Sequence, residues 1–209
     1  MHVIGLTGSI AMGKSHVGRT FRRFGVPVFD SDAAVHALFA PSAALPRAIE
    51  AAFGGVIDAE GGVDRGKLGA RVIGDPAALA RLEALVHPAV RAAQHGFLAL
   101  ASRNRMAAVV LDVPLLFETD GARRCDLVAV VDAPRFLQRA RALARPGMTK
   151  ARLDAILAQQ LPAADKRRRA DVVIASGYDR GATVEAVAAL LRRLPGWPAK
   201  AWPDRWLGD

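Results

Sequence analysis

The sequence predicts an α/β fold of three layers, in which a parallel five-stranded sheet lies between two layers of helices. Short, continuous apolar runs alternate along the chain with segments of helical periodicity, as expected for strands that are buried on both faces. A glycine-rich loop joins the first apolar run to the first helical segment. The 209 residues, of which 52% are hydrophobic and 23% charged, have the composition of a globular chain.

The glycine-rich loop reads GSIAMGKS and matches the P-loop pattern G-x-x-x-x-G-K-S. The apolar run Val3–Leu6 precedes it, and Val17, Phe21 and Phe24 follow it at helical spacing. Backbone N–H groups of such a loop hold phosphate oxygens, the lysine reaches the β- and γ-phosphates, and the serine ligates Mg²⁺. We therefore expect ATP and Mg²⁺ as cofactors. The residues expected to bind them are Gly8, Ser9, Ile10, Ala11, Met12, Gly13, Lys14, Ser15 and His16.

Four further apolar runs predict the remaining strands, at residues 107–112, 127–132 and 171–174 and within residues 25–30, which are predicted to form a turn and then a strand. Acidic residues at the carboxyl ends of parallel strands face the ligand crevice of an α/β sheet. Asp112 is therefore expected to support Mg²⁺, and Asp32 to orient or deprotonate the accepting hydroxyl group. Two structural alternatives stay open, because Asp32 could be an N-cap and Asp112 could merely end a strand.

Residues 32–105 are predicted to form a helical insertion, since they are too long for a plain crossover between strands. Asp75 is expected to cap a long helix that starts at Pro76 and that has Leu79, Leu82, Leu85 and Val86 on one face. The dipeptide His87-Pro88 is expected to interrupt this helix before it resumes toward Leu100.

Residues 135–170 are predicted to be helical, with breaks at Pro146-Gly147 and Pro162, and a last helix covers residues 180–194. Arg141 and Arg145 are one turn apart and are expected on one helix face, where they would neutralise phosphates, although exposed helix arginines are the alternative. The tail holds all three tryptophans, Trp197, Trp202 and Trp206. They could form a partner surface, but a tail folded back on the body is the favoured interpretation.

The formal net charge of +9 favours polyanionic partners, either nucleic acid or phosphorylated small molecules. The longest basic run is only Lys166–Arg169, and the chain has one tyrosine, so a nucleic-acid surface with stacking aromatics is not evident. The single cysteine, Cys125, excludes an intrachain disulfide. No signal segment or long apolar run is present, so a cytoplasmic protein without membrane contact is expected.

Several motifs in order resemble the dephospho-coenzyme A kinase family over residues 3–177. The resemblance rests most on Leu85-Val86-His87-Pro88 and on the segment from Leu111 to Glu118, which reads LDVPLLFE. Other matching segments are residues 4–15, 28–32, 62–65, 130–132, 148–149 and 170–174, together with Gln138, Arg141, Arg145, Ile156, Gln160 and Lys166.

The resemblance implies ATP-dependent phosphorylation of the ribose 3′-hydroxyl of dephospho-coenzyme A, by a monomer or small homo-oligomer. It implies a P-loop nucleotide-binding core at 1–31, 106–134 and 171–194, a helical substrate domain at 32–105 and a lid at 135–170, with the tryptophan-bearing extension at 195–209 outside it. Lys14, Asp32 and Arg141 would be catalytic, and Arg145 would contact ATP. The residues implied beside the acceptor are Asp32, Arg65, His87, Pro88, Leu115 and Glu118.

The chain departs from the family pattern at the P-loop and near residue 176. Ser9 and Ala11 stand where glycine is usual, and a non-glycine residue at positive φ costs about 1 kcal/mol. Met12 replaces serine, which is expected to put bulk at the crest of the loop, and His16 replaces threonine. Ala175-Ser176-Gly177 replaces Asn-x-Gly, with an expected effect on adenine contacts.

Three other functions compete with this interpretation. A kinase of another small acceptor, such as a nucleotide or a shikimate-like alcohol, would share the P-loop. A nucleic-acid-binding P-loop ATPase would explain the basic charge, but the chain shows no nucleic-acid motif. An inactive or regulatory relative is suggested only by the altered P-loop.

Overall fold

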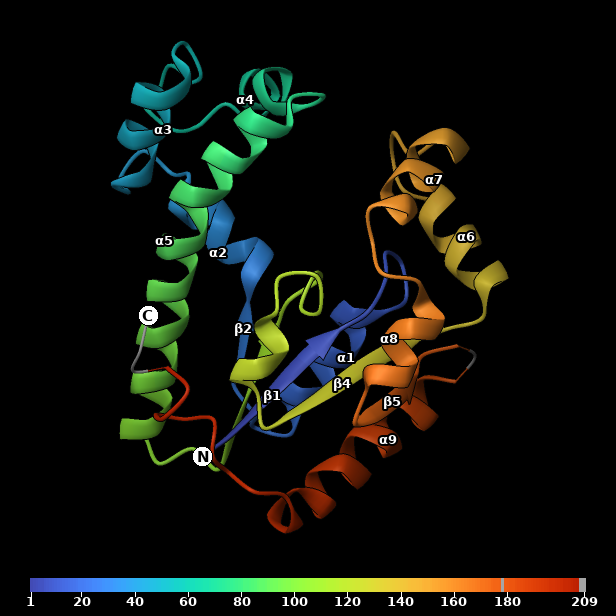
Figure 1. Cartoon of the computed structure of the whole chain (residues 1–209). Helices are drawn as coiled ribbons and strands as arrows, with labels where there is room; N and C mark the ends of the chain where they lie inside the picture. Colours follow the sequence, from blue (N-terminus) through green and yellow to red (C-terminus); the bar gives the residue numbers. More distant parts are fainter. Residues whose placement is uncertain (178, 207–209) are drawn as a thin grey trace. The chain divides into compact units, whose positions relative to one another are not determined.

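The computed structural model describes residues 1–177 and 179–206 (Figure 1). The chain forms two compact units. The first comprises residues 1–29 and 98–209, and the second comprises residues 30–97. Each unit has its own apolar core, and each is described separately below.

The first unit is built on a five-stranded sheet in the order β2-β3-β1-β4-β5. The strands are β1 (His2–Thr7), β2 (Val28–Asp30), β3 (Ala108–Asp112), β4 (Leu127–Asp132) and β5 (Val172–Ala175). The pairs β1–β3, β1–β4 and β4–β5 are parallel, and Leu6 is in register with Asp112 on one side and with Ala129 on the other. The carboxyl ends of these strands therefore meet at one edge, and the predicted parallel α/β sheet is confirmed.

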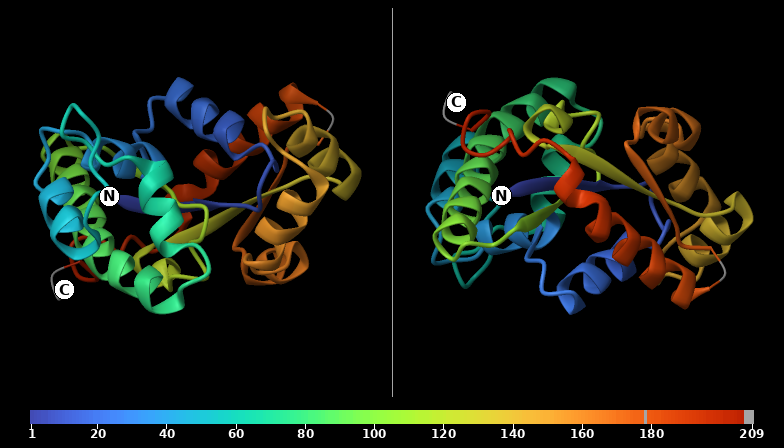
Figure 2. Two further views of the ribbon diagram at one scale, coloured as in Figure 1. Left: turned by 90° about the horizontal axis from the view of Figure 1, so that it is seen from above. Right: turned by 90° about the horizontal axis from the view of Figure 1, so that it is seen from below.

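Helices cover both faces of this sheet, as the apolar runs of its strands require. Figure 2 shows α1 (Lys14–Arg23) and α9 (Arg180–Arg193) on one face and α8 (Ala163–Arg169) on the other. Val17 and Phe21 of α1 and Val187 of α9 are fully buried against the sheet. Two further helices, α6 (Arg135–Leu143) and α7 (Lys150–Ala158), follow β4. Within residues 1–177 and 179–206, no helix is both long and apolar enough to span a bilayer.

The second unit is helical and contains α2 (Ser31–Leu38), α3 (Leu45–Phe53), α4 (Arg65–Val72) and most of α5 (Pro76–Arg103). Its core gathers apolar side chains around the fully buried Ile49 and Val56. The Asp75 carboxylate accepts hydrogen bonds from the N–H groups of Ala77 (2.9 Å) and Ala78 (3.0 Å), so the predicted cap of α5 is confirmed.

The predicted interruption of α5 at His87-Pro88 is wrong, because the helix runs through Pro88 without a break. A proline removes one N–H bond and crowds the preceding turn, which usually kinks or ends a helix. Here Val86 and Ala89, on either side of Pro88, both pack on the core of the second unit. That packing holds the helix on both sides of the lost bond.

The C-terminal tail folds back on the first unit, which confirms the favoured interpretation of the tryptophans. The Asp126 carboxylate accepts hydrogen bonds from the N–H groups of Val3 (2.8 Å), Lys200 (2.6 Å) and Ala201 (2.7 Å). Trp206 is buried, and its indole N–H donates to the carbonyl of Arg124 at 3.1 Å. The tail therefore ties the amino end of β1 to the segment before β4.

Candidate active site

The P-loop lies between β1 and α1, and its two outer glycines are required by the surrounding atoms. A Cβ on Gly8 would lie 2.7 Å from the carbonyl oxygen of Val131. Gly13 begins the helix at φ 90°, a left-handed conformation, and a Cβ there would lie 2.6 Å from the hydroxyl oxygen of Ser176. Both positions therefore accept only glycine, as the pattern predicts.

The three residues that replace the usual P-loop residues differ in their surroundings. Of Ser9, Ala11 and Met12, only Ala11 has a positive φ, at 60°. Ser9 and Met12 are buried, and the sulfur of Met12 accepts a hydrogen bond from the Ala133 N–H at 3.2 Å. The expectation that Met12 puts bulk at the crest of the loop is therefore wrong, since its side chain packs against the segment after β4. Backbone strain is confined to Ala11.

Lys14 and Asp112 form an ion pair at the carboxyl edge of the sheet. Both side chains are largely buried, with 16% of Lys14 and 6% of Asp112 exposed. The register that pairs Leu6 with Asp112 brings the end of β3 beside the loop that follows β1. The carboxylate thus does more than end a strand, because it holds the ammonium group at the mouth of the P-loop. Ser15, next to Lys14, is exposed.

A basic cavity of about 630 Å³ lies beside the start of α1. Its lining includes four arginines, namely Arg19, Arg23, Arg141 and Arg180, together with Gly13, His16, Ser176, Gly177, Asp179, Gly181, Thr183 and Val184. The Arg141 Nη2 donates to the carbonyls of Ser176 and Gly177, both at 2.9 Å. Arg141 Nη1 and His16 Nε2 are buried without a hydrogen-bond partner within the described residues.

Buried polar atoms without partners are uncommon, and each needs an explanation. Burial lowers the pKa of His16, and the nearby guanidinium groups, Arg19 foremost, lower it further. An anion in the cavity would pair with Arg141 Nη1 and relieve the repulsion between these cations. The arrangement therefore suits a phosphorylated ligand.

Sequence reasoning missed Arg19, Arg23 and Arg180. A signal was present for the first two, since His16, Arg19 and Arg23 recur at spacings of three and four residues and so share one face of α1. Arg180 gave no such signal, because it comes to the cavity from α9, far away in the sequence.

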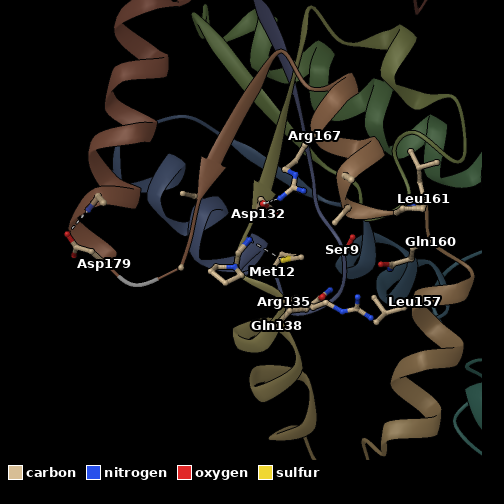
Figure 3. Close-up of a pocket in the computed structure, with 18 residues that line it drawn as sticks. Ser9, Met12, Asp132, Arg135, Gln138, Leu157, Gln160, Leu161, Arg167 and Asp179 are labelled. Atoms are coloured by element: carbon tan, nitrogen blue, oxygen red, sulfur yellow. Dashed lines mark hydrogen bonds and ion pairs between the residues drawn. The ribbon is translucent and has the colours of Figure 1, made fainter.

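A second, larger cavity of about 870 Å³ is lined by Ser9 and Met12 of the P-loop (Figure 3). Its remaining walls come from the segment after β4, from the ends of α6 to α8 that face it and from the start of α9. Arg167 in this cavity is already paired with Asp132 at 2.9 Å. Four arginines line the basic cavity and two line this one, so the basic cavity is the better match for the phosphates of a nucleotide.

Arg145 and Glu118, two of the predicted site residues, have surroundings that the sequence did not indicate. Arg145 follows the end of α6 at Leu143, so the prediction that Arg141 and Arg145 share a helix face is wrong. Glu118 accepts hydrogen bonds from the Leu161 N–H (2.8 Å) and pairs with the fully buried Lys166 (2.9 Å).

Burial of Glu118 works against its ionisation, but the bonds from Lys166 and Leu161 outweigh burial and lower the pKa of this carboxyl. Glu118 is therefore a carboxylate that is already satisfied within the chain. Leu115, earlier in the same segment, is 40% exposed and open to contact.

The remaining predicted residues belong to the second unit. The N-cap of α2 is Asp30, whose carboxylate accepts from the Ala33 N–H at 3.0 Å, so the alternative that Asp32 is the cap is wrong. Asp32 lies in the first turn of α2, and Arg65 begins α4. His87 and Pro88 are exposed in the middle of α5.

Comparison with known proteins identifies one family. The family model described as dephospho-CoA kinase matches residues 2–179. The dephospho-CoA kinase of Paramagnetospirillum magneticum is 62% identical over 80% of this chain and 78% of its own length. That of Mesorhizobium japonicum is 53% identical over 94% of this chain and 98% of its own. A crystal structure of a Thermus thermophilus protein has a TM-score of 0.78 at 32% identity, and covers 92% of this chain and 97% of its own.

Proposed function

We propose that this chain, which belongs to the dephospho-CoA kinase family, transfers the γ-phosphoryl group of ATP to the ribose 3′-hydroxyl of dephospho-coenzyme A. The observation that carries the assignment of the ATP site is the basic cavity at the P-loop, where two buried polar atoms have no partner among residues 1–177 and 179–206. Such atoms acquire partners when an anionic nucleotide binds, and that gain favours binding.

On the nucleotide side, the first N–H groups of α1 and the ammonium of Lys14 bind the phosphates, where the positive end of the helix dipole adds to the attraction. The Asp112 carboxylate orients that ammonium before ATP arrives. Arg141 supplies a second cation, through the Nη1 that has no partner within the described residues. Because these groups are fixed before the reaction, they stabilise the separating phosphates with little reorganisation.

The Ser15 hydroxyl and the Asp112 carboxylate are the oxygen donors that would hold Mg²⁺, since this ion prefers one or two protein oxygens together with phosphate oxygens. When bound, Mg²⁺ would neutralise charge on the phosphates. Asp32 acts on the acceptor, where it orients the 3′-hydroxyl or takes its proton. Arg65, His87, Pro88, Leu115 and Glu118 stay proposals for the acceptor side, as do a cytoplasmic location and a monomer or small homo-oligomer.

The experiment that tests this function measures ADP formed from Mg²⁺-ATP with and without dephospho-coenzyme A, and reads the product mass in parallel. We expect ADP formation to depend on that acceptor and the product to gain one phosphoryl group. ADP formation that is equally fast with a nucleotide or shikimate as acceptor would contradict the substrate assignment. ATP hydrolysis stimulated by RNA or DNA would instead favour a nucleic-acid-dependent ATPase.

A further inference from the structure

Ile10 of the P-loop is held by two glutamine side chains that come from distant parts of the chain. Gln160, just after α7, accepts a hydrogen bond from the Ile10 N–H at 3.1 Å. Gln138 of α6, which is 4% exposed, donates to the Ile10 carbonyl at 3.0 Å. Figure 3 shows both glutamines at the cavity that Ser9 also lines. The two peptide units that flank Ile10 are therefore both held, the Ser9–Ile10 unit through its N–H and the Ile10–Ala11 unit through its carbonyl.

The residue after Ile10 is the strained one. Ala11 has φ 60°, a left-handed conformation that costs roughly 1 kcal/mol for a residue with a Cβ. Its methyl group packs in an apolar cluster with Ala142 and Leu153, which are fully buried on α6 and α7. Ala11 is thus part of the apolar core of the segment 135–170. Strained backbone persists only where surrounding contacts determine its conformation, and this packing supplies such contacts.

The chain segment that carries Gln160 is itself held in place at the next residue, Leu161. The N–H of Leu161 donates to Glu118, which pairs with Lys166, and Lys166 also donates to the Pro114 carbonyl at 3.3 Å. Thr7, at the end of β1, donates to the same carbonyl at 3.0 Å. Gln160 therefore reaches Ile10 from a rigid base, and its amide is oriented before any ligand binds.

We propose that Gln138 and Gln160 are positioning residues for ATP, which hold Ile10 so that the strained P-loop presents its N–H groups to the phosphates. The inference rests on the proposed function only in taking ATP as the ligand of the P-loop. The backbone N–H and carbonyl of Ile10 fix the direction of each bond: position 160 must supply an acceptor, and position 138 must supply a donor.

The first test replaces each amide by a thioether of similar length, in Gln138→Met and Gln160→Met. Each variant loses one bond to Ile10, so the dissociation constant for Mg²⁺-ATP is expected to rise about threefold to tenfold. The control is Gln159→Met, at the neighbouring exposed residue. Binding is measured by calorimetry without an acceptor, so the result is independent of whether dephospho-coenzyme A is the substrate.

The second test places a carboxylate either opposite the Ile10 N–H or opposite the Ile10 carbonyl. Gln160→Glu keeps an acceptor for the Ile10 N–H, whereas Gln138→Glu puts an acceptor against the Ile10 carbonyl. We expect Gln138→Glu to weaken ATP binding clearly more than Gln160→Glu does. In the kinase assay, all weakened variants should show a raised KM for ATP and a smaller change in kcat.

Two results would overturn the proposal. One is an ATP affinity of Gln160→Met and Gln138→Met equal to that of Gln159→Met. The other is a loss of thermal stability in these variants with unchanged ATP affinity, since that pattern describes residues that only support the fold.

Discussion

The two edges of the sheet in the first unit use their polar groups in opposite ways. At the amino edge, Asp126 accepts three backbone N–H bonds, and Arg205 and Trp206 of the tail donate to the carbonyls of Cys125 and Arg124. At the carboxyl edge, His16 Nε2 and Arg141 Nη1 are buried without partners within the described residues, and Ala11 is strained. Polar groups that are satisfied inside the chain stabilise the fold, whereas groups left unsatisfied are available to a ligand.

The comparison teaches where substitutions should act on activity and where they should act on stability. Groups at the carboxyl edge were expected from the sequence to touch phosphates, and their loss should change turnover or affinity. Groups at the amino edge contact only the chain itself in the described structure, so their loss should change the free energy of unfolding. Five predictions concern these groups and Asp32 of the second unit, from the largest expected effect to the smallest.

The largest effect is expected for Lys14→Ala. Removing a preorganised cation from the phosphates typically costs a factor of about 10³ in kcat. The control is Lys150→Ala, at the exposed first residue of α7, which should retain activity. Steady-state kinetics with Mg²⁺-ATP and dephospho-coenzyme A measure both. Turnover of Lys14→Ala within tenfold of the unaltered chain would contradict the role of the P-loop lysine.

Asp32→Asn should lower kcat by about 10²-fold or more while ATP still binds, because a positioned base or orienting group contributes on this scale. The matched comparison is Asp30→Asn, since asparagine caps a helix as well as aspartate does and α2 should persist. If both variants lose the same activity, the effect comes from the start of α2 and not from the Asp32 carboxylate. Calorimetry of ATP binding separates affinity from turnover.

At the amino edge, Asp126→Ala should leave kcat/KM unchanged and lower stability. Three lost hydrogen bonds, each worth about 1 kcal/mol, sum to roughly 3 kcal/mol, and the melting temperature should fall by roughly 6 to 12 °C. Asp204→Ala, at an exposed position of the same tail, is the control. An unchanged melting temperature would mean that the tail does not stabilise this edge.

Cys125 gives an independent readout of the same edge. Burial raises the pKa of its thiol to about 12, so the native chain should react very slowly with a thiol reagent at pH 8. Asp126→Ala should speed this reaction by loosening the tail.

The smallest effect concerns His16. Its pKa is lowered in the folded chain, so the unfolded chain takes up the proton first as the pH falls below about 6.5. The stabilising contribution of neutral His16 is therefore present above that pH and is lost as the pH falls toward the folded pKa. His16→Thr should show a weaker loss of stability between pH 7.5 and 5.5, as measured by urea unfolding. An equal loss of stability in His16→Thr and in the unaltered chain would show that the ionisation of His16 does not contribute to this pH dependence.

Much of the fold was predictable because its signals are local. Buried parallel strands need continuous apolar runs, and the run at Leu127–Asp132 matches β4 residue for residue. The cap at Asp75 is equally local, because it bonds to the adjacent backbone, and the P-loop glycines belong to a recognisable sequence pattern. The register of the sheet then brings Asp112 to Lys14.

Most of the errors and omissions share a physical cause, which is that tertiary contacts overrode a local preference. Packing of Val86 and Ala89 carries α5 through Pro88, and a partner on the segment after β4 draws Met12 inward. The end of α6 before Arg145 is local instead, because Pro146 disfavours a helical conformation at the residue before it. Arg180 entered the basic cavity from a helix that no spacing connects with the P-loop.

The sequence by itself determined the sheet, the phosphate-binding loop and the chemistry of the residues around it, since these follow from apolar runs and from backbone conformations that only glycine adopts. The tertiary structure alone decided which groups satisfy one another. Ile10 meets Gln138 and Gln160 across 128 and 150 residues of chain, and Asp126 meets the tail across 74 and 75. Such pairings depend on how the elements pack, because a hydrogen bond forms wherever packing brings a donor to an acceptor.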